Sequence, residues 1–257
     1  MKLFWENNYV IQRIQLFYDY FNYNADYDKL FKNIISLAKQ GGVTNGIVCD
    51  LGCGTGELAF RFNSAGFDVI AVDNSDEMLD VLFDKRDEIE AYNVQILKQD
   101  ITQLDMFGTV DLFTCTFDTV NHLEGQRAVQ KLFDRVSLFM DPDGVFIFDM
   151  NTRYKHIHVL KNETFDFIDE EADCHWQNTL YESENRTKIS ITINDKHAGA
   201  VYSEEFFEYY YSLDTVLSML EKAGLKVVKL IDGESFKEVK ENTQRYMFMV
   251  KKEHNNG

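Results

Sequence analysis

Apolar residues along the chain fall into short runs that alternate with helical patterns. A first helical pattern follows Asp26 and ends at a Gly41-Gly42 pair. The runs that predict buried strands are 47–51, 69–72, 94–97, 110–115 and 145–148, the last preceded by a tight turn at 141–144. Helices are expected over 57–65, after Ser75, and over 128–140. This alternation predicts an α/β fold with a parallel sheet covered by helices on both faces.

The pattern changes in the second half of the chain. β-branched and aromatic residues alternate with polar ones over 164–168, 175–181, 188–193 and 202–211, which predicts antiparallel strands. A helix over 213–223 and strands over 226–231 and 245–250 then resume the earlier pattern. We therefore expect one domain, made of residues 1–154 and 212–257, interrupted by an antiparallel β insertion over 155–211.

Charge and composition narrow the class of partner. The 257 residues include 26 basic and 43 acidic side chains, a formal net charge of -17, and no run of Lys or Arg exceeds two. Such a surface repels phosphate backbones, so nucleic acid is not an expected partner. No apolar stretch is long enough to span a membrane, and no signal peptide is visible. Four scattered cysteines indicate a reduced, cytoplasmic protein rather than a disulfide framework.

A glycine-rich turn follows the first predicted strand and precedes a helix. Its sequence is DLGCGTGE, from Asp50 to Glu57. The dinucleotide-binding turn has the spacing G-x-G-x-x-G, whereas this one has G-x-G-x-G with a carboxylate two residues ahead. A carboxylate at Asp50 would repel a pyrophosphate and would suit a ligand that carries an ammonium group. The spacing therefore favours an amino-acid-bearing nucleoside over a nicotinamide dinucleotide.

Further acidic residues recur where predicted strands end. Asp73 ends the second strand, 21 residues after Gly52, where a carboxylate can accept hydrogen bonds from ribose hydroxyls. Asp100 follows the third strand and Asp118 the fourth. In an open α/β sheet, ligands bind outside the carboxyl ends of the strands. The sequence therefore predicts one binding site at this edge of the sheet.

The runs DLGCGTGE, VIAVDNSDEML, QDI, DLFTCTFDTVNHL and DGVFIFD together resemble the class I S-adenosylmethionine-dependent methyltransferases. The resemblance implies a Rossmann-like, doubly wound sheet of seven strands with an antiparallel last strand. It also implies S-adenosyl-L-methionine as cofactor. By the same resemblance, Asp50 and the loop residues Gly52, Cys53, Gly54 and Gly56 hold the methionine moiety. Asp73 binds the ribose, Asn74 and Met78 lie beside the adenosine, Asp100 and Ile101 flank the adenine, and Phe117 approaches the methionine end.

The flanking segments resemble a small-molecule subgroup of these enzymes, which includes amino-sugar and glycine or sarcosine N-methyltransferases. The resemblance rests on the aromatic segment FYDYFNYNADYD, the D-T-x-N-H-L motif and the β insertion. It implies a small-molecule acceptor and an N-terminal lid containing Tyr18, Tyr23 and Tyr27. The β insertion is then expected to serve as a lid or as the surface of a homodimer.

Methyl transfer to an amine or hydroxyl benefits from a nearby base, and Asp118 and His122 are the candidates by position. No metal-binding constellation is visible in the sequence, so no metal is expected. Two alternatives stay open: an RNA or protein methyltransferase, and a binding protein that keeps the cofactor pocket without turnover. An NAD-dependent oxidoreductase is disfavoured by the glycine spacing.

Overall fold

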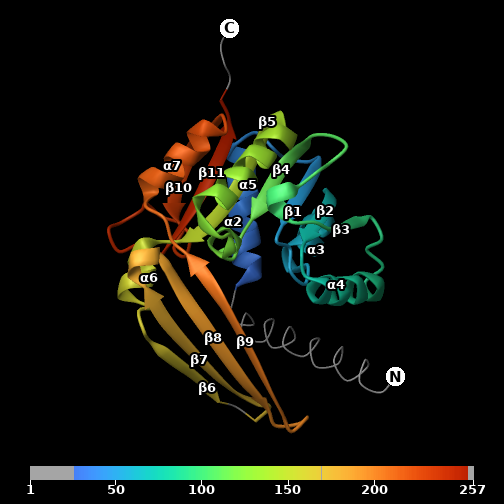
Figure 1. The fold of residues 1–257 in the computed structure, drawn as a ribbon. Coiled ribbons are helices and arrows are strands. Elements are labelled where there is room, and N and C mark those ends of the chain that lie inside the picture. The colour runs from blue at the N-terminus through green and yellow to red at the C-terminus, as the bar shows by residue number, and fades with distance from the viewer. Residues whose placement is uncertain (1–25, 169, 254–257) are drawn as a thin grey trace.

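The computed structural model describes residues 26–168 and 170–253, which form two β-sheets (Figure 1). The larger sheet has seven strands. β11 runs antiparallel to both of its neighbours, β10 and β5, and all the other neighbouring pairs in the sheet are parallel. This confirms the predicted doubly wound sheet with an antiparallel last strand. Its spatial order is β10 (Leu225–Asp232), β11 (Arg245–Lys252), β5 (Met140–Asn151), β4 (Val110–Cys115), β1 (Ile47–Leu51), β2 (Asp68–Asp73) and β3 (Val94–Lys98).

Helices cover both faces of the seven-stranded sheet. On one face lie α2 (Tyr27–Gln40), α3 (Glu57–Ser64) and α4 (Asp76–Glu88), and on the other lie α5 (Gly125–Phe139) and α7 (Leu213–Lys222). Adjacent strand residues such as Val48 and Cys49 enter opposite cores, because side chains alternate along a strand. The same strands therefore contribute apolar residues to the cores on both faces of the sheet. None of the described helices is long and apolar enough to cross a membrane.

Polar side chains cap the helices where the sequence leads one to expect them. The Asp26 carboxylate accepts a hydrogen bond from the Lys29 backbone N–H at 2.8 Å. Ser75 Oγ accepts one from the Met78 N–H at 3.2 Å, which confirms the predicted start of α4. Each cap satisfies a backbone donor that the first turn of a helix leaves without a partner, and typically stabilises the fold by about 1 kcal/mol.

The predicted turn before the fifth strand is wrong in its boundaries. Residues 141–144 lie inside β5, and the pairing of β4 with β5 shifts register between the pairs Val110↔Met140 and Leu112↔Val145. The Asp143 N–H donates to the Asp141 carboxylate at 3.0 Å, as in a local turn. The turn chemistry is therefore present, but it forms a bulge within the strand because both flanks remain paired with β4.

The second sheet has four antiparallel strands in the order β6 (Thr164–Ile168), β7 (Ala172–Tyr181), β8 (Arg186–Asp195) and β9 (Ala200–Tyr209). The four predicted strand runs are thereby confirmed. Cys174, Ile193 and Tyr202 are paired across the strands on one face and form a small apolar cluster. The opposite face carries polar pairs such as Ser190 with Glu205. The sheet projects from the larger one, with the short α6 (Arg153–His158) at the junction (Figure 1).

Asn121 joins the two sheets. Its side chain is fully buried in the loop after β4. Its Nδ2 donates to the carbonyl of Asn151 at 3.2 Å and to that of Tyr209 at 2.8 Å, while its Oδ1 accepts from the Asn151 N–H at 2.8 Å. One amide thus ties the ends of β5 and β9 to the loop that carries the D-T-x-N-H-L motif.

Candidate active site

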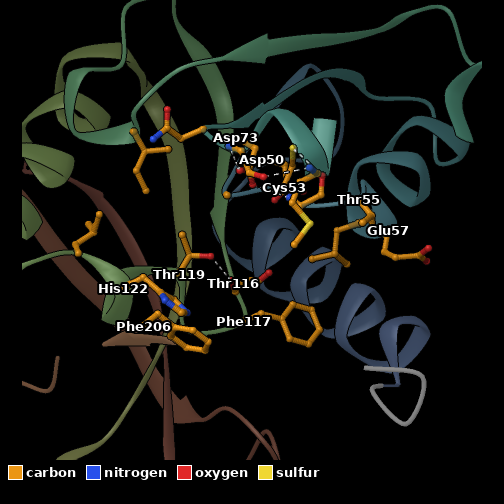
Figure 2. A pocket seen from close by; sticks show the side chains of 18 of the residues that line it. Asp50, Cys53, Thr55, Glu57, Asp73, Thr116, Phe117, Thr119, His122 and Phe206 are labelled. Carbon is orange, nitrogen blue, oxygen red and sulfur yellow. Dashed lines mark hydrogen bonds between the residues drawn. The ribbon is translucent and has the colours of Figure 1, made fainter. Parts of the chain in front are cut away.

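A pocket of about 420 Å³ lies at the carboxyl ends of the central strands and reaches the apolar face of the second sheet (Figure 2). The predicted site residues that line it are Tyr27, Asp50, Gly52, Cys53, Gly54, Asp73, Asn74, Met78, Asp100, Ile101, Phe117 and His122. Gly56 and Asp118 are not part of this lining, and Tyr18 and Tyr23 lie outside the described residues. The structure therefore brings most of the predicted residues to one cavity.

The glycine loop depends on glycine for two different reasons. Gly52 has φ +69°, and a Cβ there would lie 2.5 Å from the Thr119 side chain. Gly56 has φ +88°, and a Cβ there would lie 2.9 Å from Leu82. The first glycine therefore permits contact with the loop after β4, and the second permits α3 to start close to α4.

Asp50 presents a buried carboxylate to the pocket. Its side chain is 3% exposed and accepts a hydrogen bond of 2.7 Å from Thr114 Oγ1. Burial raises the pKa of Asp50 to about 7, the hydrogen bond from Thr114 opposes that rise, and nearby Asp73 adds to it. Among the described residues the carboxylate has no salt-bridge partner. A cationic group of a ligand would supply the missing counter-charge.

Asp73 holds the loop at the end of β2. Its Oδ2 accepts from the Gly54 N–H at 2.9 Å and its Oδ1 from the Ser75 N–H at 3.0 Å. The Gly54 N–H is therefore already paired with a carboxylate and is not available to a pyrophosphate. Each carboxylate oxygen has further lone pairs for ribose hydroxyls.

Asp100 and Ile101 form the wall beyond β3. The Asp100 carboxylate accepts hydrogen bonds from the Thr102 N–H at 2.8 Å and from Gln103 Nε2 at 2.9 Å. These hydrogen bonds lower the pKa of Asp100 against the opposing effect of its burial. Ile101 is 7% exposed and offers an apolar surface. The pair thus presents a carboxylate acceptor beside an apolar side chain, which would suit an adenine.

A strained turn after β4 places Phe117 at the pocket. Phe117 and Asp118 both have positive φ, 54° and 53°, which is uncommon outside glycine. Their N–H groups donate to the buried Asp149 carboxylate at 3.0 and 2.7 Å. The Phe117 ring then packs against Tyr27, with ring centroids 5.0 Å apart. Asp149, which sequence reasoning missed, therefore fixes the turn.

Asp118 points toward Arg245 rather than into the pocket lining. The Arg245 guanidinium pairs with Asp118 at 2.7 Å and with Asp149 at 3.0 Å. Arg245 is the main charge that lowers the pKa of Asp118 to about 2, against the opposing effect of burial. So acidic a carboxyl group is a weak proton acceptor. The predicted role of Asp118 as a base remains a prediction, and this salt bridge argues against it.

His122 stands at the opposite end of the pocket from the glycine loop (Figure 2). Its ring packs against Phe206 of β9, with centroids 5.2 Å apart. The lining residues that sequence reasoning missed are Thr55, Glu57, Leu58, Ser75, Thr116, Thr119, Leu123, Ile191, Ile193, Glu204 and Phe206. The period-2 pattern of β8 and β9 could have indicated which of their residues share a face, but not that this face meets His122.

S-adenosylmethionine fits the groups that this cavity offers. Asp50 could bind its ammonium group, Asp73 its ribose hydroxyls, and Asp100 with Ile101 its adenine. A nicotinamide dinucleotide fits less well, because the buried Asp50 carboxylate beside the glycine loop would repel its pyrophosphate. Fold and site together define a class I S-adenosylmethionine-dependent methyltransferase.

Comparisons with known proteins agree with this class. Residues 48–144 match the methyltransferase domain family. A solved S-adenosylmethionine-dependent methyltransferase from Clostridium acetobutylicum is 28% identical, with a TM-score of 0.86 over 93% of this chain and 98% of that one. A protein of Geobacillus sp. (strain WCH70), itself only inferred to be a methyltransferase, is 28% identical over 91% of this chain and 96% of its own.

The fold is also shared with a solved amino pentose methyltransferase from Micromonospora echinaspora that contains bound S-adenosylmethionine. That structure is 16% identical, with a TM-score of 0.67 over 88% of this chain and 90% of that one. The chain is therefore an S-adenosylmethionine-dependent methyltransferase of the class I fold.

Proposed function

We propose that this enzyme methylates a nitrogen or oxygen of a small molecule that is neutral or cationic. The observation that carries the proposal is the lining of the pocket. Five carboxylates line it, and no Lys or Arg among the described residues does. A phosphate or carboxylate on the acceptor would meet no cationic side chain there. An RNA backbone is disfavoured for the same reason.

In this proposal the two ends of the pocket have different tasks. Asp50 binds the ammonium group of the cofactor, and Asp73, Asn74, Met78, Asp100 and Ile101 bind its nucleoside. Bound S-adenosylmethionine supplies an activated methyl group on a sulfonium, so the protein needs no nucleophile of its own. Burial raises the pKa of the Cys53 thiol beside this site, which keeps it protonated.

The acceptor end is formed by His122, Phe206 and the isoleucines of β8. Their apolar surfaces exclude water and orient the acceptor, which is the main protein contribution to such a displacement. His122 is the candidate group to take up the acceptor's proton. Residues 155–211 thereby act as the acceptor-facing part of the chain, either as a lid or as the surface of a homodimer, against residues 1–154 and 212–257 that hold the cofactor.

The experiment uses radiolabelled S-adenosylmethionine and a cell extract, separated afterwards into metabolites, RNA and protein. We expect label in the metabolite fraction. The Asp73→Asn variant should lose it, whereas Asp68→Asn, an exposed carboxylate at the other end of β2, should keep it. Label in RNA or protein would overturn the small-molecule acceptor. An absence of label with intact cofactor binding would favour a binding-only role.

A further inference from the structure

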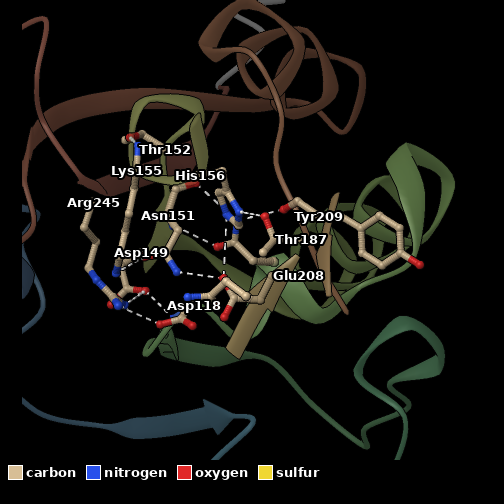
Figure 3. A network of polar contacts seen from close by, with 12 residues as sticks. Asp118, Asp149, Asn151, Thr152, Lys155, His156, Thr187, Glu208, Tyr209 and Arg245 are labelled. Carbon is tan, nitrogen blue, oxygen red and sulfur yellow. Dashed lines mark hydrogen bonds and ion pairs between the residues drawn. The ribbon is translucent and has the colours of Figure 1, made fainter. Parts of the chain in front are cut away.

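Three side chains from two distant parts of the chain converge beside the acceptor end of the pocket. Asp118 and His122 lie in the loop after β4, and Glu208 lies near the end of β9. One potential metal-ligating atom from each lies within 4.8 Å of the others. Figure 3 shows Asp118 and Glu208 in one polar network with Arg245, Asn151 and His156. Asn121 holds the junction of the two sheets together, so the convergence is a built feature of the fold.

Each of the three side chains retains an atom for a ligand. Asp118 uses Oδ1 for Arg245, and Glu208 uses Oε2 for Asn151 Nδ2 at 3.0 Å. Within the described part of the chain, Asp118 Oδ2, Glu208 Oε1 and the ring nitrogens of His122 make no hydrogen bond. The cluster thus presents two carboxylate oxygens and one imidazole nitrogen.

The charges around Glu208 are not balanced by the described residues. Glu208 is 4% exposed, and its one hydrogen-bond donor is a neutral amide. Arg245 divides its guanidinium between Asp118 and Asp149, and Lys155 Nζ donates to Asn151 at 3.0 Å. Three carboxylates therefore face two cationic side chains.

A second observation points to a missing ligand. His156 Nε2 is fully buried, has no hydrogen-bond partner among the described residues, and lies 3.6 Å from Glu208 Oε2 (Figure 3). Its Nδ1 is engaged by Thr187 Oγ1 at 2.9 Å, which fixes the ring orientation. Carboxylates that bind metals are commonly supported by such a neighbouring hydrogen-bonding group, and a small movement would bring this one into contact.

We propose that Asp118, His122 and Glu208 bind one divalent transition-metal ion, of the type of Mn²⁺ or Zn²⁺. One imidazole with two carboxylates suits such an ion better than Mg²⁺ or Ca²⁺, which prefer oxygen ligands alone. Metal–ligand distances of about 2.0–2.2 Å place ligands roughly 3–4 Å apart, so binding draws the three side chains together by about 1 Å. Of the three ligands only His122 lines the pocket. With a metal bound, His122 would be a ligand and would not take up the acceptor's proton, so the ion replaces that role rather than adding to it.

The test is a Mn²⁺ titration of the full, chelator-treated chain, followed by electron paramagnetic resonance, with Zn²⁺ as competitor. We expect one site per chain that Zn²⁺ displaces. Glu208→Gln and His122→Asn should each weaken it about tenfold or more, and Glu208→Gln still offers an oxygen to Asn151. The matched control is Glu205→Gln, on the outward face of the same strand, which should leave the affinity unchanged.

The site would be overturned if the folded wild type bound no stoichiometric Mn²⁺, or if Glu208→Gln bound Mn²⁺ as tightly as wild type. It would also be overturned if Glu205→Gln lost as much Mn²⁺ affinity as Glu208→Gln, because that would indicate nonspecific binding by the acidic surface. Thermal unfolding of each variant verifies its fold. Titration with S-adenosylmethionine in the same samples separates this result from the proposed function, because that binding depends on Asp50 and Asp73 and not on the metal cluster.

Discussion

The two ends of the pocket are built in different ways. The cofactor end comes from consecutive strand–loop–helix units, and its carboxylates Asp73 and Asp100 are held by backbone N–H groups a few residues away or in the adjacent loop. The acceptor end joins His122 to Phe206, 84 positions apart by the numbering, and depends on long-range contacts such as Asn121 with Tyr209. The end of the pocket built from neighbouring units should tolerate changes elsewhere in the fold. The end built from distant segments requires that the two sheets stay packed against each other.

The largest expected effect tests this dependence on distant contacts. Arg245→Met removes the cation between Asp118 and Asp149 and leaves one half-buried and one buried carboxylate without their salt-bridge partner. Breaking such a pair costs about 3 kcal/mol or more of the free energy of unfolding. Urea unfolding should show this loss. Arg153→Met, at an exposed pair with Glu182, should change stability by less than about 1 kcal/mol; equal losses in both variants would contradict the special role of Arg245.

The next effect concerns the cofactor end. Asp50→Asn keeps the shape and the Thr114 contact but removes the negative charge that we propose binds the cofactor's ammonium group. Hydrogen bonds to charged groups contribute about 1.5–3 kcal/mol, so the affinity for S-adenosylmethionine should fall roughly 10- to 100-fold. Calorimetric titration measures it, with Asp68→Asn as the control. Unchanged affinity would mean that Asp50 does not bind the ammonium group of the cofactor.

The titration of Asp50 predicts how the affinity for S-adenosylmethionine changes with pH. Its pKa of about 7 in the ligand-free protein means that the carboxyl is largely protonated below pH 7, and a protonated carboxyl attracts a cation weakly. Affinity for S-adenosylmethionine should therefore fall by up to about tenfold per pH unit below 7 and level off above it. Calorimetry from pH 5.5 to 8.5 measures the profile. Asp50→Asn should flatten it; a profile that persists in this variant would assign the titration to another group.

The smallest effect on cofactor binding is expected at the acceptor end. Phe206→Ala removes the ring that packs on His122 but touches none of the groups assigned to the nucleoside. The affinity for S-adenosylmethionine should stay within about twofold of wild type, while label transferred to metabolites falls about tenfold from lost packing and orientation. Calorimetry measures the cofactor affinity and label counting measures the methyl transfer of the same variant. A matching loss of both would mean that the two ends are not separable.

The sequence by itself predicted which residues meet at one end of the pocket, and it predicted the order of the elements. The glycine loop, Asp73 and Asp100 follow apolar runs whose period identifies strands, and the carboxyl ends of parallel strands meet at one edge of the sheet. The helix caps at Asp26 and Ser75 are equally local. In each case the residues that interact lie within one unit of the chain or in neighbouring strands, so spacing alone carries the information.

Only the tertiary structure decided the acceptor end. The strand pattern over 188–193 and 202–211 predicted a sheet but could not show that Ile191, Ile193 and Phe206 face the pocket. Nor could it show that Arg245 neutralises Asp118, or that Glu208 and His156 meet the loop after β4. The residue partners here lie on segments tens of positions apart, and their pairing follows from how two sheets dock. Docking is fixed by packing and buried hydrogen bonds that no local spacing encodes.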